Sequence, residues 1–281
     1  LAPPRGIFII DRTEPGQLLV ELPIPFESPY LAAGGLTVLK RLNAKALAIA
    51  PAEWTSDGAV ATDALTNYQS MFQEFHRAIA GHDALQLRAL GGGDRPQSTD
   101  EELGGDRQAG SSIVRVKERL PPGLDLAALE ALVGSLQVKF GAGRSRNIQR
   151  EEVDWGFAEV FLSVKAAREL VLRGEGPAES ETTGDPRSLR TAGVADRILA
   201  AASSIAQKGT DLYRPPTLEE LLFFDTEVLG PVLRAVATEH VDGHWSQNGL
   251  ARLGAAAISA RAMGYRIERV ADPSLPGEFL M

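Results

Sequence analysis

The feature that most constrains this chain is an alternation of short apolar runs with amphipathic helical segments through its first 173 residues. The apolar runs have the length and composition of β-strands, and they occupy Ile7–Ile10, Leu18–Leu22, Ala44–Ala50, Ala84–Leu90, Ser112–Val116 and Val160–Val164. Between them, apolar residues recur three or four positions apart, as in helices, at Leu31–Leu42, Asp63–Ala80, Leu126–Gly134 and Ala166–Arg173. Because each element must bury one face, the alternation predicts an α/β fold with a mixed central sheet covered by helices.

Turn and cap residues refine this prediction locally. Glu14-Pro15-Gly16 separates the first two apolar runs and predicts a hairpin between them. Asp125 stands immediately before Leu126–Gly134, where its carboxylate can accept a hydrogen bond from the first helical turn. The sequence therefore predicts a helix that begins after Asp125.

The pattern changes after residue 173. Residues 174–191 are polar and punctuated by Gly and Pro, which predicts a linker or mobile loop. Residues 192–281 have the pattern of a helical extension with a terminal strand, expected at Val194–Gln207, Leu218–Thr238, Leu250–Met263 and, for the strand, Tyr265–Val270. Periodicity leaves open whether this extension completes the sheet of residues 1–173 or covers it from outside.

Charge and composition exclude several classes of partner. The chain has 37 acidic and 29 basic residues, a formal net charge of −8, and so offers no broad positive field for nucleic acid. No apolar run in the sequence reaches the roughly 18–20 residues that span a bilayer. The absence of cysteine removes disulfides and thiol chemistry, and Leu1 as first residue fits either a cytoplasmic protein or one exported after removal of a leader.

Seven short motifs follow one another in a recognisable order. They are Glu21-Leu22-Pro23-Ile24-Pro25, Asn43–Ala50, Thr62–Asn67, Ser70–His76, Leu85-Gln86-Leu87-Arg88, Arg146-Asn147-Ile148-Gln149-Arg150 and Phe161-Leu162-Ser163-Val164-Lys165. Their order resembles that in zinc carboxypeptidase-like, poly-γ-glutamate hydrolase-like and N-formylglutamate amidohydrolase-like proteins, and it covers residues 7–173. The resemblance implies a hydrolase-like core with a zinc carboxypeptidase-like sheet over residues 1–173.

The positions that carry zinc chemistry in the resembling proteins hold other residue types in this chain. Ile24 and Arg88 stand where the family motifs have histidine, and Lys165 stands where they have the glutamate base. A catalytic zinc needs about three ligands drawn from His, Asp or Glu and an open position for water. An aliphatic side chain cannot coordinate, and a permanent cation repels a divalent metal. The departures therefore predict a degenerate member of the family, with no catalytic residue, no metal and no cofactor.

Two cations in place of a metal predict binding in place of turnover. If Arg88 and Lys165 face one cleft, they can hold a carboxylate or phosphate through charge-assisted hydrogen bonds. The corresponding turn and first strand of the family line the cleft, which completes a predicted ligand site of Arg88, Lys165, Arg146, Arg150, Glu21 and Glu27. The expected ligand is an anionic small molecule or polymer. A protein partner or a second copy of the chain is the alternative.

The same residues also have a purely structural interpretation. Arg88 or Lys165 can form an ion pair with Glu21, Glu27 or Glu159, and such a pair would simply hold the sheet together. In the same way, Arg146 and Arg150 can pair with Glu151 and Glu152 in a solvated loop.

Two further functions stay open on the sequence. One is an active hydrolase of the amidase or peptidase type, since carboxylates alone can hold a hard cation or act as an acid and base pair. Its candidate residues are Glu21, Glu27, Glu53, Asp63 and His76. The other is a structural subunit whose cleft is filled by its own side chains.

Overall fold

The computed structural model describes the greater part of the chain, in several stretches. These are residues 6–12, 16–25, 28, 30–50, 64–79, 83–90, 111–141, 147–153, 156–174, 197–198, 217–238, 240–241, 244–271 and 278–281. The expected linker at 174–191, apart from Gly174, and most of the expected helix Val194–Gln207 lie outside the described residues.

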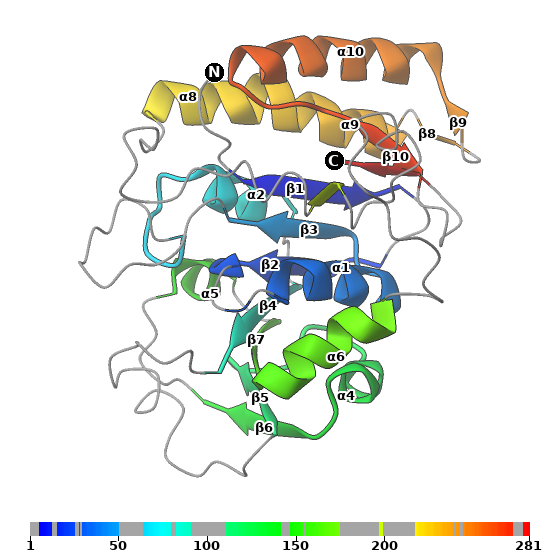
Figure 1. Ribbon diagram of the computed structural model, residues 1–281. Coiled ribbons are helices and arrows are strands. Elements are labelled where there is room, and N and C mark those ends of the chain that lie inside the picture. The colour runs from blue at the N-terminus through cyan, green and yellow to red at the C-terminus, as the bar shows by residue number, and fades with distance from the viewer. Residues whose placement is uncertain are drawn as a thin grey trace.

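A mixed sheet forms the centre of the molecule (Figure 1). Its described strands are β1 Ile7–Asp11, β2 Leu19–Leu22, β3 Ala46–Ile49, β4 Ala84–Ala89, β5 Ser112–Val116, β6 Leu136–Phe140, β7 Phe157–Leu162, β10 Arg269–Ala271 and β11 Glu278–Leu280. They lie in the order β10-β11-β1-β3-β2-β4-β7-β5-β6. The four central strands β3, β2, β4 and β7 are parallel, while β1, β11 and β10 on one side pair antiparallel. The α/β class with a mixed sheet that the alternation predicts is confirmed.

The predicted hairpin between the first two strands is wrong. β3 lies between β1 and β2, pairing antiparallel with β1 and parallel with β2. Residues Ala46–Ile49 of β3 are buried throughout and carry no polar side chain, so this strand is suited to a position with neighbours on both edges. A turn signal such as Glu14-Pro15-Gly16 predicts that the chain reverses direction, but it does not predict which strand comes to lie alongside.

One face of the sheet is apolar and packs against three helices. These are α1 Leu31–Arg41, α4 Leu126–Val133 and α6 Val164–Gly174, and Figure 1 shows α1 and α6 lying together over the central strands. Leu22, Leu47, Leu85 and Val160 are among the strand residues that contribute to this core. The helix predicted after Asp125 is confirmed, because the Asp125 carboxylate accepts a hydrogen bond from the Ala128 amide.

Glycine allows α1 to approach its neighbours closely. A Cβ at Gly35 would lie 2.6 Å from Leu22 Cδ1, and one at Gly34 would lie 3.4 Å from Leu170 Cβ on α6. Gly35 therefore allows α1 to lie close to the sheet, whereas a Cβ at Gly34 would make an ordinary contact with α6.

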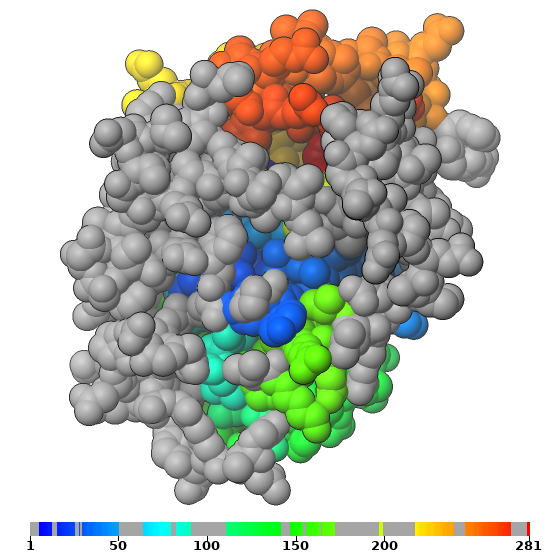
Figure 2. All heavy atoms as spheres, viewed as in Figure 1, coloured from blue at the N-terminus to red at the C-terminus, as the bar shows by residue number. Residues whose placement is uncertain are grey.

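The opposite face of the sheet is covered by α2 Met71–Ile79, by α5 Ile148–Glu152 and by helices from the C-terminal part of the chain. Those helices are α8 Leu218–Phe223, the π-helical segment η4 Phe224–Leu229, α9 Gly230–Thr238 and α10 Gln247–Ala262. Phe8 of β1 stacks on Phe75 of α2, with ring centroids 4.7 Å apart. Phe224 also packs against the Phe8 ring, with centroids 5.8 Å apart. In Figure 2 the orange atoms of α10 form the upper edge of the molecule.

The C-terminal part of the chain both covers the sheet and extends it. Strand β11 pairs with β1, and β10 pairs with β11, so the last residues add two strands to the sheet edge. The expected strand Tyr265–Val270 begins later, at Arg269. The expected helix Leu218–Thr238 is continuous but contains a π-helical turn, and Thr217 forms a capping box with Glu220 at its start. A small pair of strands, β8 His240–Val241 and β9 His244–Trp245, precedes α10. Among the described helices, none has the length and apolarity needed to cross a membrane.

Candidate functional site

A row of polar side chains crosses the sheet on the face opposite α1 and α6. The strands are in register so that Glu21 of β2 pairs with Gln86 of β4, and Gln86 pairs with Glu159 of β7. Glu159 in turn lies opposite Arg115 of β5, and Arg115 lies beside Lys139 of β6. Because alternate residues of a strand face the same side of a sheet, residues paired in this way share one face. The first four side chains of the row are buried.

At the β2 end of the row, a carboxylate and a histidine form a buried pair. His76 Nδ1 on α2 lies 2.9 Å from Glu21 Oε1, and the Gln86 amide donates to Glu21 Oε2 at 3.1 Å. An ionised carboxylate accepts hydrogen bonds, so this contact favours the tautomer with the hydrogen on Nδ1. Helix α2 turns His76 toward the sheet because its aromatic residues, such as Phe72 and Phe75, occupy the same buried side.

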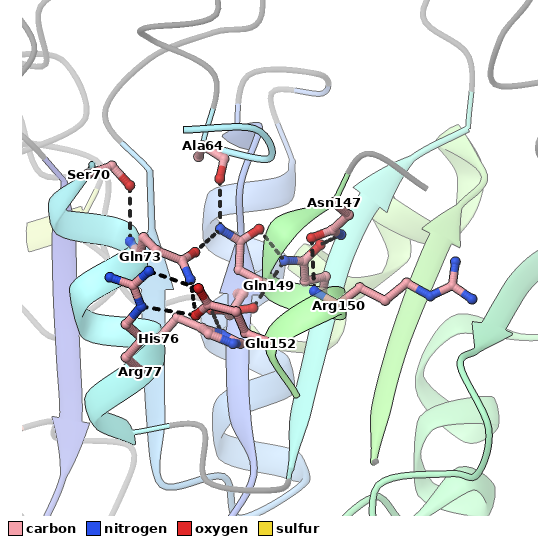
Figure 3. Close-up of polar contacts among 11 residues, drawn as sticks. Ala64, Ser70, Gln73, His76, Arg77, Asn147, Gln149, Arg150 and Glu152 are labelled. Atoms are coloured by element: carbon pink, nitrogen blue, oxygen red, sulfur yellow. Dashed lines mark hydrogen bonds and ion pairs between the residues drawn. The ribbon is translucent and has the colours of Figure 1, made fainter. Parts of the chain in front are cut away.

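Amide side chains link this pair to α5. Asn147 caps α5 by accepting a hydrogen bond from the Arg150 amide, and its Nδ2 donates to Gln86 Oε1 at 2.7 Å and to Glu159 Oε1 at 2.9 Å. Gln149 donates through Nε2 to Gln73 Oε1 at 2.5 Å and to the Ala64 carbonyl at 2.7 Å. Figure 3 shows the side chains of Gln73 and Gln149 turned toward one another between α2 and α5. The helices and the sheet are thus held together by a continuous buried network.

The network ends in an ion pair that is partly open to solvent. Gln73 Nε2 donates to Glu152 Oε2 at 2.5 Å, and Arg77 holds both Glu152 oxygens, with Nη2 2.8 Å from Oε1. Burial alone raises the pKa of Glu152, but the hydrogen bonds and charge of Arg77 outweigh it, so the net shift is downward. Burial raises the pKa of Glu74, and Arg77 only partly opposes that shift. Arg77 thus contacts two carboxylates, Glu152 with a lowered pKa and Glu74, 2.8 Å from Nη1, with a raised pKa.

The other end of the row is cationic. Arg88 of β4 lies over the Phe161 ring at 5.2 Å, and its Nη1 is 3.9 Å from Glu159 Oε1. The structural interpretation that the sequence allowed for Arg88, an ion pair with Glu159, is therefore present, although that distance is too long for a hydrogen bond. Arg115 approaches Glu159 from the strand on its other side. Arg88 and Arg115 are 7% and 5% exposed, against 1% for Glu159, so the arginines lie nearer the surface than the carboxylate.

The remaining predicted ligand residues lie elsewhere. The side chain of Lys165 on α6 is 82% exposed and its ammonium lies 3.8 Å from Glu169, so the contacts of the described residues do not bring it to Glu159. Arg150 is buried, and its guanidinium donates to the Gly141 carbonyl at 2.9 Å. Figure 3 shows the Arg150 side chain extended away from the Gln149 network. Ile24, which follows β2, is buried.

Several expectations fall on residues that the structure does not describe. Glu27 and Arg146 of the predicted ligand site lie outside the described residues, as do Glu53 and Asp63 of the alternative hydrolase. Of that alternative set, the structure brings Glu21 and His76 together. In the described part of the chain, no three His, Asp or Glu side chains are grouped to hold a metal ion.

Sequence reasoning missed Arg115 as a site residue and missed the start of β7. Arg115 stands between Val114 and Val116 in a run that is otherwise apolar, and an isolated cation in a buried strand was the available signal. The strand β7 begins at Phe157, before the predicted Val160, because Glu159 interrupts the apolar run. Both residues face the polar side of the sheet, where apolar periodicity does not extend.

Comparisons of the chain with protein-family models, with curated proteins and with solved structures give no match. The family resemblance therefore rests on the order of the seven motifs alone, and the polar face is interpreted from its own chemistry.

Proposed function

We propose that this protein binds an anionic ligand on the polar face of its sheet and does not carry out zinc-dependent hydrolysis. The observation that carries the proposal is the charge distribution at the β4, β7 and β5 strands. Two buried arginines lie on either side of Glu159. Arg115 of β5 is opposite it in the sheet, and Arg88 of β4 has its Nη1 3.9 Å from Glu159 Oε1.

A buried guanidinium with an unmet hydrogen bond is costly to maintain. Moving a charge out of water costs several kcal/mol unless a counter-charge and hydrogen bonds replace the lost hydration. Arg115 is buried, and its Nη2 makes no hydrogen bond to any of the described residues. An anionic ligand would supply an acceptor for it. The planar guanidinium groups are suited to carboxylate or phosphate oxygens, which they bind in a bidentate manner.

The sequence resemblance supports binding over zinc chemistry. The three positions at which the resembling proteins carry zinc-site residues hold Ile24, Arg88 and Lys165 in this chain. An arginine at such a position repels a divalent metal and attracts the anionic part of a substrate instead. A scaffold that exchanges its metal for a guanidinium would keep an affinity for anionic ligands and lose the means to activate water.

One observation favours a second candidate, a hydrolase with a rebuilt site. Glu21 and His76 form a buried pair at 2.9 Å, and a carboxylate that orients a histidine is the arrangement of many general bases. The two candidates differ in a simple way. A hydrolase would consume an amide or peptide ligand, whereas a binding protein would release it unchanged.

Titration calorimetry on the purified protein tests the proposal. Inorganic phosphate, glutarate and poly-glutamate serve as probes, and the metal content of the same sample is measured. We expect saturable binding of at least one probe, no chemical change in poly-glutamate, and weakening by about tenfold or more in Arg88→Gln. That factor follows from the loss of about 1.5–3 kcal/mol for a charge-assisted hydrogen bond.

The control variant is Arg168→Gln, which removes an exposed arginine of α6 and should leave binding unchanged. Lys165→Gln should also bind normally, because that side chain is directed to solvent. If Arg88→Gln does not fold, the wild-type titration still decides. Absence of binding by all three probes, or stoichiometric zinc with hydrolysis of poly-glutamate, would refute the proposal.

A further inference from the structure

The strongest unassigned feature is a pair of unsatisfied groups on β5 and β7, at the cationic end of the polar row. Its interpretation as a ligand site rests on the proposed function. Arg115 is buried, yet its Nη2 makes no hydrogen bond to any residue in the described stretches. None of the ion pairs among those residues includes Arg115, although Glu159 lies directly opposite it in the sheet. A buried guanidinium nitrogen without an acceptor is rare in folded proteins, because the unmade hydrogen bond is costly.

Glu159 has a carboxylate oxygen without a hydrogen-bond donor. Its Oε1 accepts from Asn147 at 2.9 Å, while its buried Oε2 has no hydrogen-bond donor among the described residues. Two neighbouring strands therefore offer, on one face, a donor that lacks an acceptor and an acceptor that lacks a donor. A ligand placed between them would satisfy both.

We propose that the ligand group is an oxyanion that carries its own hydroxyl, namely hydrogen phosphate or the monoanion of a phosphate monoester. Its anionic oxygens accept hydrogen bonds from Arg115, and the positive charge of Arg88 lies on the other side of Glu159. Its hydroxyl donates to Glu159 Oε2. In this arrangement Glu159 is a specificity residue, because a carboxylate accepts a hydrogen bond from a protonated oxyanion and repels one without a proton.

This assignment separates ligands of similar size and charge. Sulfate has the tetrahedral shape of phosphate but is fully deprotonated at neutral pH, so it cannot donate to Glu159. A simple carboxylate such as acetate is also deprotonated and has only two oxygens. Leaving a buried acceptor unsatisfied costs about one to two factors of ten in affinity. Inorganic phosphate should therefore bind at least about tenfold more tightly than sulfate or acetate.

The first experiment measures dissociation constants of the wild-type protein for inorganic phosphate, O-phosphoserine, sulfate and acetate at pH 7 and constant ionic strength. Tighter binding of phosphate than of sulfate supports the inference, and comparison with O-phosphoserine shows whether an ester is accepted. Equal binding of phosphate and sulfate, or binding of acetate alone, overturns the inference but leaves anion binding intact. Failure of every anion, including glutarate and poly-glutamate, overturns the proposed function as well.

The second experiment changes Glu159 to test whether it sets the preference for phosphate over sulfate. Glu159→Gln keeps the shape of the side chain and replaces an oxygen acceptor by an amide that can donate. We expect sulfate to bind at least about tenfold more tightly to this variant than to the wild type, and the phosphate preference to disappear. Glu130→Gln, on the exposed side of α4, is the matched control. An unchanged phosphate-to-sulfate ratio in folded Glu159→Gln would contradict the role of Glu159, and the wild-type ratio decides if that variant does not fold.

Discussion

Replacing Gln86 by methionine tests whether the buried polar network stabilises the fold. Gln86 is fully buried, donates to Glu21 at 3.1 Å and to Gln149 at 3.3 Å, and accepts from Asn147 at 2.7 Å. Methionine has nearly the same length and flexibility but neither donates nor accepts strongly. The substitution therefore removes the central hydrogen-bonding group of the network with little change in volume.

The expected loss follows from the groups left behind. Asn147 Nδ2 retains its bond to Glu159, so two acceptors lose a partner, Glu21 Oε2 and Gln149 Oε1. Each unsatisfied buried group costs about 1–3 kcal/mol, and the greater burial of apolar atoms in methionine returns about 1 kcal/mol. The free energy of unfolding should fall by about 3 kcal/mol, which is a large fraction of the 5–15 kcal/mol typical of folded domains.

Equilibrium unfolding in urea, followed by circular dichroism at pH 7, measures this loss. Gln69→Met is the matched control, because Gln69 is exposed and the same chemical change there should alter stability by less than about 0.5 kcal/mol. A loss below about 1 kcal/mol in Gln86→Met would refute the reasoning. It would mean that water or a rearrangement of Gln149 satisfies the abandoned acceptors at little cost.

Two further predictions concern packing and pH. Gly35→Ala should destabilise the protein by about 1–2 kcal/mol, because the new Cβ would lie 2.6 Å from the buried Leu22 Cδ1, whereas Gly254→Ala, with nothing within 4 Å, should stabilise by about 0.5–1 kcal/mol. Thermal denaturation of both variants checks the pair, and an equal sign for the two would contradict it. Glu152→Gln should lose less than about 1 kcal/mol, since the Arg77 side chain is 41% exposed. The pKa of Glu152 is lowered from its ordinary 4.5, so its contribution is present above that pH and is lost as the pH falls through the lowered pKa. Urea titrations between pH 7 and pH 3 should therefore show the two proteins converging in acid, and a constant difference would be the contrary result.

The sequence predicted individual elements best where the signal was local. Asp125 caps the helix α4 as its position predicts, because a cap involves residues within one turn of each other, and Thr217 caps α8 in the same way. The strand β6 was missed although Leu136, Val138 and Phe140 alternate with Gln137 and Lys139, the period of a half-buried strand, because the prediction there relied on continuous apolar runs. A half-buried edge strand gives a weaker apolar signal than a central one.

The candidate site was predicted less completely, and the reason is distance along the chain. Arg88 and Glu21 were identified from their motifs, but their partners come from segments dozens of residues away. Nothing in the local sequence of Arg115 indicates that it lies opposite Glu159. Lys165, which the motif order places beside Arg88, begins a helix that turns it toward solvent.

By itself, the sequence determined most of the strands and helices of residues 1–173 and that this chain would form an α/β fold. Those properties depend on the period of apolar residues and on short-range capping, which are local. The tertiary structure alone decided that β3 lies between β1 and β2 and that Glu21, Gln86, Glu159 and Arg115 form one row. Strand order and register are set by packing between distant segments. A shift of any one of these strands by one residue would have turned its member of the row to the apolar face.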